Sequence, residues 1–381
     1  MIYLDNAATT PVRREVLEAI WPVLTTGFGN PSSHHQVGEA AAAALADARA
    51  TVAAVLGCRP AEVLFTSGGT ESDNLAVKGI ALAAPRGRHL IVSAIEHEAV
   101  LESCDYLRRF HGFAVTLLPV DAQGLVDPAE LARALTPATT LVSVQYANNE
   151  VGTVQPIRDL SALAGAQGVP FHTDAVQAAG WLPLSVAGLG VDALSISGHK
   201  LGAPQGTGAL FLRRRVPIEP VQHGGGQERG NRSGTENVAG AVALATALRL
   251  AETERESNAP RVADLRDAFI AAVLAAAPGA RLTGHPLQRL PGTASFVFPG
   301  TSGEAVLLEL EGHGIVCSSG SACAAGSDEP SPTHPPMGLP AEVAQTAVRF
   351  TLSSSTTGAE LSETARAVGL AVATIRGLGR R

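Results

Sequence analysis

Short apolar segments alternate with segments of helical spacing between about residues 60 and 212, and this alternation constrains the fold more than any other feature of the chain. Several of the apolar segments are continuously apolar, as expected for strands that are buried on both faces of a sheet. The pattern therefore predicts an α/β domain built on a mainly parallel sheet of seven strands. The expected strands are Glu62–Thr66, His89–Ala94, Val115–Leu118, Leu141–Gln145, Phe171–Asp174, Ala193–Ser197 and Gly208–Leu212, and the expected helices between them are Glu71–Ala83, Val100–Phe110, Pro128–Ala134 and Ile157–Gln167.

The remainder of the chain predicts a second, smaller unit. A long helical pattern at Ala239–Glu256 precedes a region in which we expect two further helices, then strands, a helix and a loop rich in Gly, Ser and Pro. We expect a large domain at residues 13–258 and a smaller α+β domain made of residues 1–12 and 259–381. The loop in the smaller domain contains Cys323.

The composition excludes several classes of protein. The net charge is -7, and no block of Lys and Arg indicates a surface for nucleic acid or acidic membranes. No stretch reaches the roughly 18 uninterrupted apolar residues of a membrane-spanning helix, and the first residues lack a signal-peptide pattern. The four cysteines have neither the pattern of a disulfide framework nor the paired spacing of a zinc site. We therefore expect a cytoplasmic protein that binds no metal, no nucleic acid and no membrane.

Lysine is scarce in this chain. Lys and Arg total 28, yet the only lysines are Lys78 and Lys200. Arg cannot replace Lys as a nucleophilic amine because its guanidinium stays protonated. Lys200 follows an expected buried strand in the motif SISGHK, where its amine would face a pocket, although it could also be a solvated loop lysine. Lys78 has the helical setting of an ordinary surface lysine.

Polar clusters follow the expected strands at their carboxyl ends, where ligands bind in sheets of this class. Asp174 closes one strand, and its carboxylate could pair with the ring nitrogen of a pyridoxal cofactor or cap the next helix. Gln177 could reach the phenolic oxygen of the same ring or be a simple helix residue. In SGGT, Gly69 and Thr70 form a turn whose backbone N–H groups could bind phosphate, although glycines also form ordinary turns.

Further candidates lie in other motifs. His97 could stack on a cofactor ring or merely start a helix, and Asn149 could contact the ligand or form a turn. Arg349 lies in an apolar strand, where a substrate carboxylate or an internal salt bridge would satisfy its charge equally well. Cys323 differs from the other cysteines because its surroundings, SSGSACAAGSDEPSP, predict an exposed loop. Ser197 could supply further phosphate contacts, together with the histidine of SGHK.

With these residues assembled, the chain resembles the cysteine desulfurases of the NifS/IscS type, within the fold-type I, class V aminotransferase-like superfamily of pyridoxal-phosphate enzymes. The resemblance runs nearly end to end. It is carried, in chain order, by YLDNAATTP, GNPSS, FTSGGTESDN, EHEAV, NNEVG, DAVQ, SGHK, HGGGQERGNRSGTEN and SSGSAC. The motifs are specific as a set, whereas no single one would be.

The resemblance implies a role for each matching residue. Lys200 would hold pyridoxal 5′-phosphate as a Schiff base, Asp174 would pair with its ring nitrogen, and His97 would stack on the ring. Cys323 would attack the sulfur of L-cysteine, which leaves alanine and a persulfide for an acceptor protein in iron–sulfur cluster assembly or thiolation. The other implied contacts are Asn149 and Gln177 to the cofactor, Gly69, Thr70, Ser197 and His199 to its phosphate, Thr235 to the phosphate in the other subunit of a homodimer, and Arg349, Asn149 and Asn30 to the substrate carboxylate.

The chain departs from the family pattern in two places. Pro332, Pro335 and Pro336 make the first turn of the helix that usually follows this loop implausible. The segment LSSSTTG lacks the Gly-Arg that often follows the strand containing Arg349.

The alternative functions are a selenocysteine lyase or another carbon–sulfur lyase on the same fold, and a non-catalytic binding protein. Cys323 argues against the lyases, because a simple elimination needs no nucleophilic thiol, and Lys200 with Asp174 and His97 argues against the binding protein.

Overall fold

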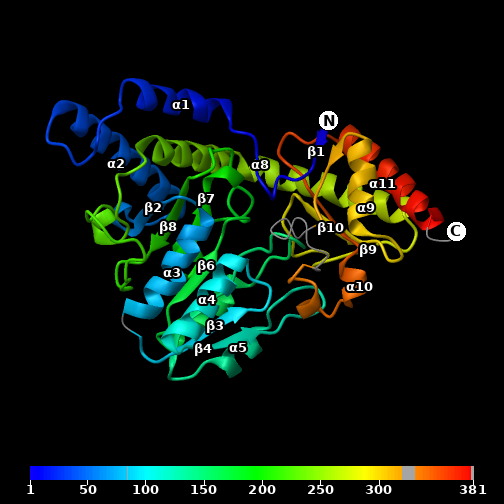
Figure 1. The fold of residues 1–381 in the computed structure, drawn as a ribbon, viewed down its shortest axis with the longest axis horizontal. Helices are drawn as coiled ribbons and strands as arrows, with labels where there is room; N and C mark the ends of the chain where they lie inside the picture. Colours follow the sequence, from blue (N-terminus) through cyan, green and yellow to red (C-terminus); the bar gives the residue numbers. More distant parts are fainter. Residues whose placement is uncertain (84, 320–330, 379–381) are drawn as a thin grey trace.

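The structure is a computed structural model that describes residues 1–83, 85–319 and 331–378, and a seven-stranded sheet forms its centre (Figure 1). The order of the strands is β2-β8-β7-β6-β5-β3-β4. β8 is antiparallel to both neighbours, and every other pair is parallel. The seven strands are β2 (Val63–Thr66), β3 (His89–Ser93), β4 (Ala114–Leu118), β5 (Thr139–Ser143), β6 (Phe171–Asp174), β7 (Ala193–Ser197) and β8 (Gly208–Leu212).

All seven expected strands are confirmed, with ends that differ by at most two residues. The largest difference is at β5, which ends at Ser143 instead of Gln145. The backbone N–H of Gln145 donates to the carboxylate of Glu96 (2.8 Å), so a side chain replaces the neighbouring strand as its acceptor. This contact begins the loop that follows β5 and shapes the site described below.

Helices cover both faces of the sheet. In β3, Leu90 and Val92 belong to one hydrophobic cluster and Ile91 to another, because successive side chains of a strand point to opposite faces. The first cluster includes α3 and α4, and the second includes α1, α2, α6 and the first half of α8 (Figure 1). The helices along this part of the chain are α1 (Arg14–Thr25), α2 (Gln36–Leu56), η1 (Pro60–Glu62), α3 (Gly69–Ala83), α4 (Glu98–His111), α5 (Pro128–Ala134), α6 (Ile157–Ala166), α7 (Val186–Leu189), η2 (Gly198–Lys200) and η3 (Glu228–Gly230).

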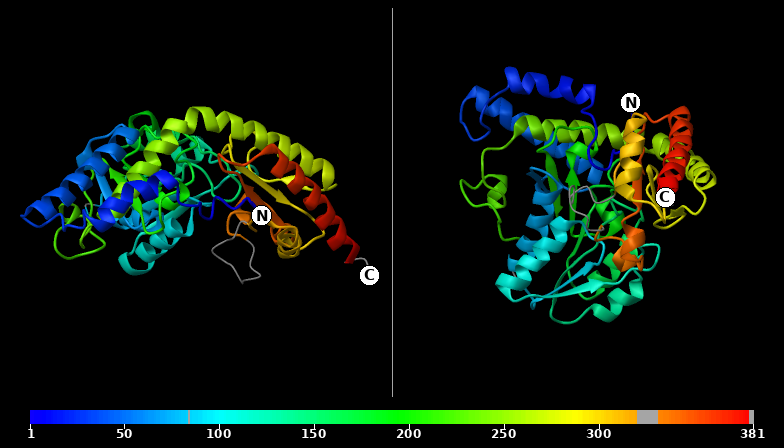
Figure 2. Two further views of the ribbon diagram at one scale, coloured as in Figure 1. Left: turned by 90° about the horizontal axis from the view of Figure 1, so that it is seen from above. Right: turned by 45° about the vertical axis from the view of Figure 1, so that its right-hand side comes forward.

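One long helix joins two hydrophobic cores. α8 (Val238–Ala276) is 39 residues long and continues through Pro260, and Figure 2 shows it spanning the molecule. Its first half packs Leu244 and Leu248 into the larger core, and its second half packs Val262 and Phe269 into the smaller one. The expectation of separate helices beyond residue 260 is therefore wrong. The apolar pattern breaks off where the helix crosses between the cores, although the backbone continues.

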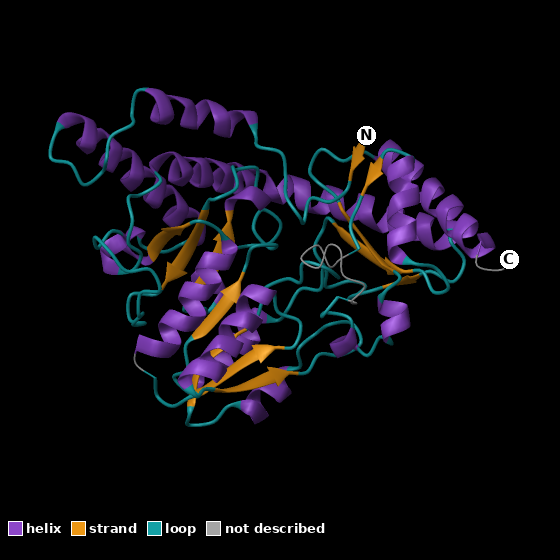
Figure 3. Cartoon of the chain, viewed as in Figure 1, coloured by secondary structure: helices purple, strands orange, loops and turns teal. Residues whose placement is uncertain are grey.

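The smaller core lies around a second group of strands, which Figure 3 shows apart from the main sheet. The N-terminal strand pairs in parallel with β11, and Leu4 is fully buried in this core. The expected boundary at residues 258 and 259 falls inside α8, so we keep the division into two domains as a proposal. The remaining elements are β1 (Ile2–Tyr3), β9 (Arg281–Leu282), β10 (Thr293–Val297), α9 (Gly303–Gly312), β11 (Ile315–Val316), η5 (Pro335–Met337), α10 (Ala341–Ala344), β12 (Ala347–Thr351) and α11 (Gly358–Leu378).

The proline-rich segment forms a short turn of 3-10 helix, η5. Pro335 and Pro336 occupy its first two positions, where a missing N–H costs nothing because no helical acceptor is available there. The segment does not form a longer helix, and Gly338 ends the turn with a positive φ of 80°. This agrees with the expectation that Pro332, Pro335 and Pro336 make the first turn of the usual helix implausible.

Candidate functional site

A cavity of about 370 Å³ lies at the carboxyl ends of the parallel strands. Ten of the residues that the sequence singled out line it together, although they come from six different segments of the chain. They are Gly69, Thr70, His97, Asn149, Asp174, Gln177, Ser197, His199, Lys200 and Arg349. The strand ends bring these residues together because parallel strands all point the same way, as ligand sites in such sheets require.

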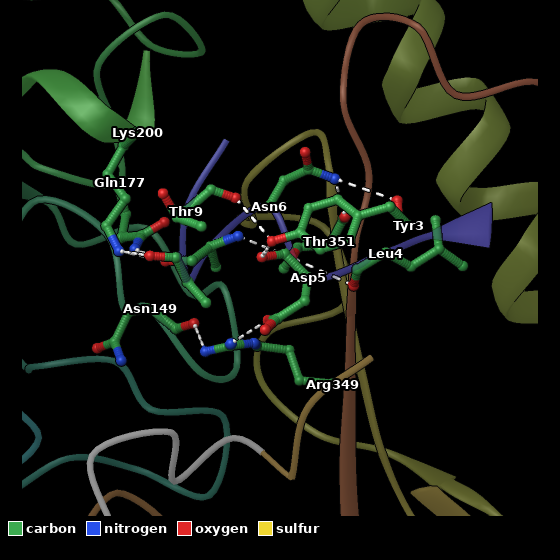
Figure 4. Close-up of polar contacts among 12 residues, drawn as sticks. Tyr3, Leu4, Asp5, Asn6, Thr9, Asn149, Gln177, Lys200, Arg349 and Thr351 are labelled. Atoms are coloured by element: carbon green, nitrogen blue, oxygen red, sulfur yellow. Dashed lines mark hydrogen bonds and ion pairs between the residues drawn. The ribbon is translucent and has the colours of Figure 1, made fainter. Parts of the chain in front are cut away.

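Lys200 is held at the wall of this cavity by the N-terminal segment. It ends η2, directly after β7, and its Nζ donates to the backbone oxygens of Ala7 (2.6 Å) and Ala8 (2.7 Å). The side-chain amide of Gln177 donates to the same Ala7 oxygen (3.1 Å), so the two side chains lie together in Figure 4. The contacts place a primary amine in a partly buried position where it can reach a ligand.

Asp174 supplies a carboxylate to the same cavity. It ends β6, is 8% exposed, and accepts a hydrogen bond from the N–H of Val176 through Oδ1 (2.8 Å). Burial raises the pKa of this carboxyl, while His97 and Lys200 act in the opposite direction. A buried carboxylate of this kind could pair with the protonated ring nitrogen of a pyridoxal cofactor. The positive charge on that nitrogen would stabilise the ionised form of Asp174.

The start of α3 provides a cradle for an anion. α3 begins at Gly69, so its first amides have no acceptor within the helix. A Cβ at Gly69 would lie 2.8 Å from Cγ2 of Val176 and 3.6 Å from Cβ of Ser197, so only glycine fits against these neighbours. Ser197 and Thr70 line the cavity beside this turn. The group of donors fits a phosphate.

Two histidines complete the cofactor side of the cavity. His97 precedes α4, and its Nδ1 accepts from the N–H of Ala99 (3.1 Å), which leaves Nε2 of the ring to face a ligand. Nδ1 of His199 lies 3.1 Å from Oγ1 of Thr9. Burial, with a smaller contribution from Lys200, lowers the pKa of His199 to about 4. His199 is therefore a neutral hydrogen-bonding group at physiological pH.

Arg349 makes an internal ion pair in this structure. The residue lies in β12 and is 2% exposed. Its Nη2 contacts Oδ1 of Asp5 (2.7 Å), and its Nη1 donates to the backbone oxygen of Asn149 (2.9 Å), as Figure 4 shows. Its Nε has no acceptor among the described residues. Of the two interpretations that the sequence left open, the geometry shows the salt bridge, and the N–H of Nε stays without an acceptor in the described part of the chain.

Two of the predicted residues that the structure describes lie outside this cavity. Asn30 and Thr235 are both exposed, and Oδ1 of Asn30 accepts from the N–H of Ser32 (2.9 Å). Cys323 lies outside the described residues. On one side of its segment, the backbone of Ser318 pairs with that of Arg349.

Buried carboxylates are the part of the site that the sequence reasoning missed. Asp73, Glu96 and Glu150 line the cavity and are at most 6% exposed. Burial raises the pKa of Glu96 to about 8 and that of Glu150 to about 7, and it raises the pKa of Asp73 well above its ordinary value. All three belong to the motifs TESDN, EHEAV and NNEVG. Their position at strand ends was therefore a signal that could have identified them.

Glu150 should make stability depend on pH. Its Oε2 accepts a hydrogen bond from Oγ of Ser331, and burial raises its pKa from 4.5 to about 7. Between these values the folded protein holds a proton that the unfolded chain has lost, so the free energy of unfolding falls as pH rises. The expected loss is about 3 kcal/mol. We expect Glu150→Gln, which is neutral at every pH, to lack this part of the decrease when thermal unfolding is followed from about pH 4.5 to 8.

Parallel pH dependence of unfolding in the wild type and Glu150→Gln would show that Glu150 is ionised in the folded protein. The exposed Glu102→Gln is the matched control, because it removes a surface carboxylate that does not act on Glu150. Its unfolding curve should follow that of the wild type.

Comparison with known proteins places this site in a family context. The model of the family described as aminotransferase class-V matches residues 2–363. A cysteine desulfurase IscS from Dictyoglomus turgidum is 46% identical over 364 residues, which are 95% of this chain and 92% of that protein. A solved NifS-like protein superposes with a TM-score of 0.91 at 37% identity, and the match covers 98% of this chain and 99% of that one. The solved structure of SspA in complex with cysteine superposes with a TM-score of 0.81 at 35% identity. This match covers 94% of this chain and 100% of that one. Across the described residues, we find no helix long and apolar enough to cross a membrane.

Proposed function

The chain belongs to the aminotransferase class-V family, and we propose that it is a cysteine desulfurase that works with pyridoxal 5′-phosphate and carries sulfur on Cys323. The observation that carries the proposal is the position of Lys200 and Asp174 in one cavity, with Arg349 in its wall. A reactive amine, a carboxylate for a ring nitrogen and a cation for a substrate carboxylate are the groups that this chemistry needs. The names of the similar proteins support the choice of reaction.

The residues of the cavity fit the cofactor. Lys200 would hold it covalently through its amine, Asp174 would pair with its ring nitrogen, and His97 would lie against its ring. Asn149 and Gln177 would hydrogen-bond the ring substituents. The phosphate would lie at the start of α3, with contacts from Gly69, Thr70, Ser197 and His199. When bound, the cofactor supplies an electron sink that stabilises negative charge on the substrate Cα.

The protein residues would then act on the substrate. The amine of Lys200, released when substrate binds, would remove the proton from Cα. The Cys323 thiolate would attack the substrate sulfur, so that a carbon–sulfur bond breaks and a sulfur–sulfur bond forms. The products are alanine and a Cys323 persulfide, and no outside oxidant is required. An acceptor protein of iron–sulfur cluster assembly or thiolation, in the cytoplasm, would receive the sulfur.

A second copy of the chain would complete the site. Thr235 is exposed and outside the cavity, as expected if it contacts the phosphate bound to the other subunit. α1 and the segment after it extend from the body of the molecule (Figure 1), and Leu17, Trp21, Leu24 and Phe28 expose apolar side chains there; Trp21 is 69% exposed and Phe28 is 72% exposed. Exposed apolar side chains that cluster in this way favour burial against a partner. We therefore propose a homodimer.

Arg349→Lys should weaken cysteine binding more than it changes turnover. Lysine keeps the positive charge but loses the planar fork that binds a carboxylate through two N–H groups. We expect KM for L-cysteine to rise by about 10-fold or more, with the bound cofactor unchanged. Steady-state kinetics and the cofactor absorbance measure the two effects.

Asp5→Asn tests the role of Arg349 in substrate binding by changing its ion-pair partner. Asp5 is the internal partner of Arg349 at 2.7 Å, so its neutralisation should free the guanidinium for the substrate and lower KM. If both variants lose stability while KM stays constant, Arg349 serves only the fold.

The proposed function is tested by supplying the purified protein with pyridoxal 5′-phosphate and L-cysteine. We expect a visible cofactor band and equal amounts of alanine and protein-bound or released sulfur. A selenocysteine lyase would use L-selenocysteine and leave L-cysteine unchanged. A non-catalytic protein would show no band and no product, which would overturn the proposal.

A further inference from the structure

Four carboxylates line one cavity and are almost completely buried. Glu150 accepts a hydrogen bond from Ser331, and the other three act on one another. Asp73 is 1% exposed, Glu96 is 3% exposed and Asp174 is 8% exposed. His97 and Lys200 act on Asp174 in the direction that lowers its pKa. Three negative charges so close together in a site with little water would be unfavourable, so we expect some of these acids to keep their protons.

Hydrogen bonds distinguish Asp174 from Glu96. Asp174 accepts from the backbone N–H of Val176, and this bond, His97 and Lys200 all favour its charged form. Glu96 accepts two hydrogen bonds at Oε1, from Oγ of Ser93 (2.6 Å) and from the N–H of Gln145 (2.8 Å). Its Oε2 has no hydrogen-bond partner within residues 1–83, 85–319 and 331–378, and it has almost no contact with solvent. A buried carboxylate oxygen without a donor is costly when it is charged, so a proton on Oε2 fits this geometry.

Asp73 resembles Glu96 in this respect. Its Oδ1 lies 3.6 Å from Nε2 of His172 and has no hydrogen-bond partner in the described part of the chain. Burial and Asp174 raise the pKa of Asp73, and Ser195 opposes them only in part. The two ring nitrogens of His172 contact the hydroxyls of Ser143 (2.8 Å) and Ser195 (3.0 Å), and burial lowers the pKa of this histidine to about 3. His172 is thus neutral and supplies no charge to hold an ionised Asp73. The negative charge of the cavity wall therefore belongs on Asp174.

Glu96 also connects two loops of the site. Ser93 ends β3, and Gln145 follows β5, so the bonds to Oε1 hold the β3–α4 loop against the β5–α6 loop. The side-chain amides of Gln145 and Asn148 strengthen this connection, because both donate to the backbone oxygen of Ile95. The first loop carries His97 and the second carries Asn149. A displacement of Glu96 would therefore move both sides of the cofactor cavity.

We propose that Glu96 is a positioning residue that works as a neutral acid: Oε1 fastens the His97 loop to the Asn149 loop, and the proton on Oε2 leaves the negative charge of the wall on Asp174. The inference rests on the proposed function, since Asp174 is taken to face the cofactor ring. Glu96 would touch neither substrate nor cofactor, and it would act through the two loops and the charge of Asp174.

The groups around Glu96 determine how it responds to pH. Asp174 on β6 and Asp73 on α3 oppose its ionisation, and Cys104 on α4 is a neutral thiol whose pKa burial raises to about 12. His97 and the exposed Glu98 lie beside it in sequence. Burial, more than any neighbouring charge, raises the pKa of Glu96 to about 8. Above that pH, ionisation of Glu96 would place a second negative charge near Asp174. The electrostatic potential at the cofactor would then change.

The test compares the cofactor absorbance of the holoenzyme with that of Glu96→Gln across the pH range. Glutamine keeps an oxygen that accepts from Ser93 and Gln145, and its amide replaces the protonated oxygen without a charge. We expect the wild type to show an inflection near pH 8 that is missing from E96Q, while the two profiles coincide at lower pH. Glu102→Gln removes an exposed carboxylate from α4, the helix that follows Glu96, and it should keep the inflection.

Two results would overturn the proposal. If the profile of E96Q is shifted at low pH, Glu96 carries a charge in the working enzyme. If the inflection near pH 8 persists in E96Q, it belongs to another group.

Infrared spectra of wild-type protein labelled with ¹³C at the glutamate carboxyl groups give a second measurement that needs neither the variant nor the cofactor. We expect a protonated-acid carbonyl band that is lost in two steps, one near pH 7 from Glu150 and one near pH 8 from Glu96, and Glu150→Gln should remove only the first step. Absence of the step near pH 8 would contradict the inference even if E96Q does not fold. A wild type that never shows the cofactor band would instead contradict the proposed function, and the infrared result would still decide the protonation of Glu96.

Discussion

Lys200→Ala should abolish the visible cofactor band and lower alanine formation from L-cysteine by at least about 10³-fold. The amine would hold the cofactor and move the Cα proton, so one substitution removes both functions. Lys200→Arg should fail in the same way, because a guanidinium keeps the charge but is not a nucleophile at physiological pH. Absorbance of the reconstituted variants and an alanine assay measure the two losses.

The scarcity of lysine gives this experiment a matched control. Lys78 is the only other lysine, and its Nζ donates to Oδ1 of Asn74 (2.6 Å) and lies 4.6 Å from the ring centre of Tyr106. Lys78→Ala should therefore keep the cofactor and the activity. Reduction of the holoenzyme with borohydride, followed by peptide mass analysis, should find the cofactor mass on the peptide that contains Lys200. The same mass on the peptide of Lys78 would refute the assignment.

Lys200 also holds the N-terminal segment, so a purely structural effect has to be separated from a chemical one. Its contacts to Ala7 and Ala8 disappear in the alanine variant along with the amine. Added primary amines should restore part of the activity of Lys200→Ala if the chemistry of the amine is what was lost. A variant that is inactive only because the segment has moved would not respond to them.

The main sheet could be predicted because its signals are local. Continuous apolar runs such as Ala193–Ser197 identify buried strands without knowledge of their neighbours. The carboxyl ends of parallel strands then assemble the polar motifs, so Lys200, Asp174 and His97 could be placed in one site before any coordinates were available. These residues line the same cavity in the structure.

The features that were missed depend on contacts between distant parts of the chain. The partner of Arg349 is Asp5, 344 residues away, and no local pattern indicates that pairing. α8 continues past residue 260 because two separate cores each bury one half of it, and its middle part has no apolar stripe. Glu96 belongs to a motif that was recognised, but its role follows from complete burial, which the sequence does not show.

Cys323→Ala should keep the cofactor band but lower alanine formation by about 10²-fold or more. Without the thiol, nothing in the proposed mechanism accepts the substrate sulfur, although the cofactor can still bind the amino group. Persulfide labelling of the wild type should find sulfur on Cys323, and the alanine assay should follow its loss in the variant. Undiminished alanine production would refute the persulfide mechanism while leaving the cofactor assignment intact.

The other three cysteines are the controls, because their thiols are poor nucleophiles at physiological pH. Burial raises the pKa of Cys58 to about 11 and that of Cys104 to about 12, and it raises that of Cys317 further. Cys317 is the strongest competitor, since it follows β11 and lies near Asp5 and Arg349. Cys317→Ser should nevertheless keep full activity, because a thiol that stays protonated cannot attack sulfur efficiently. A persulfide on Cys317, or a loss of activity in this variant that equals the loss in Cys323→Ala, would move the sulfur-accepting role to this half-buried residue and contradict the proposed mechanism.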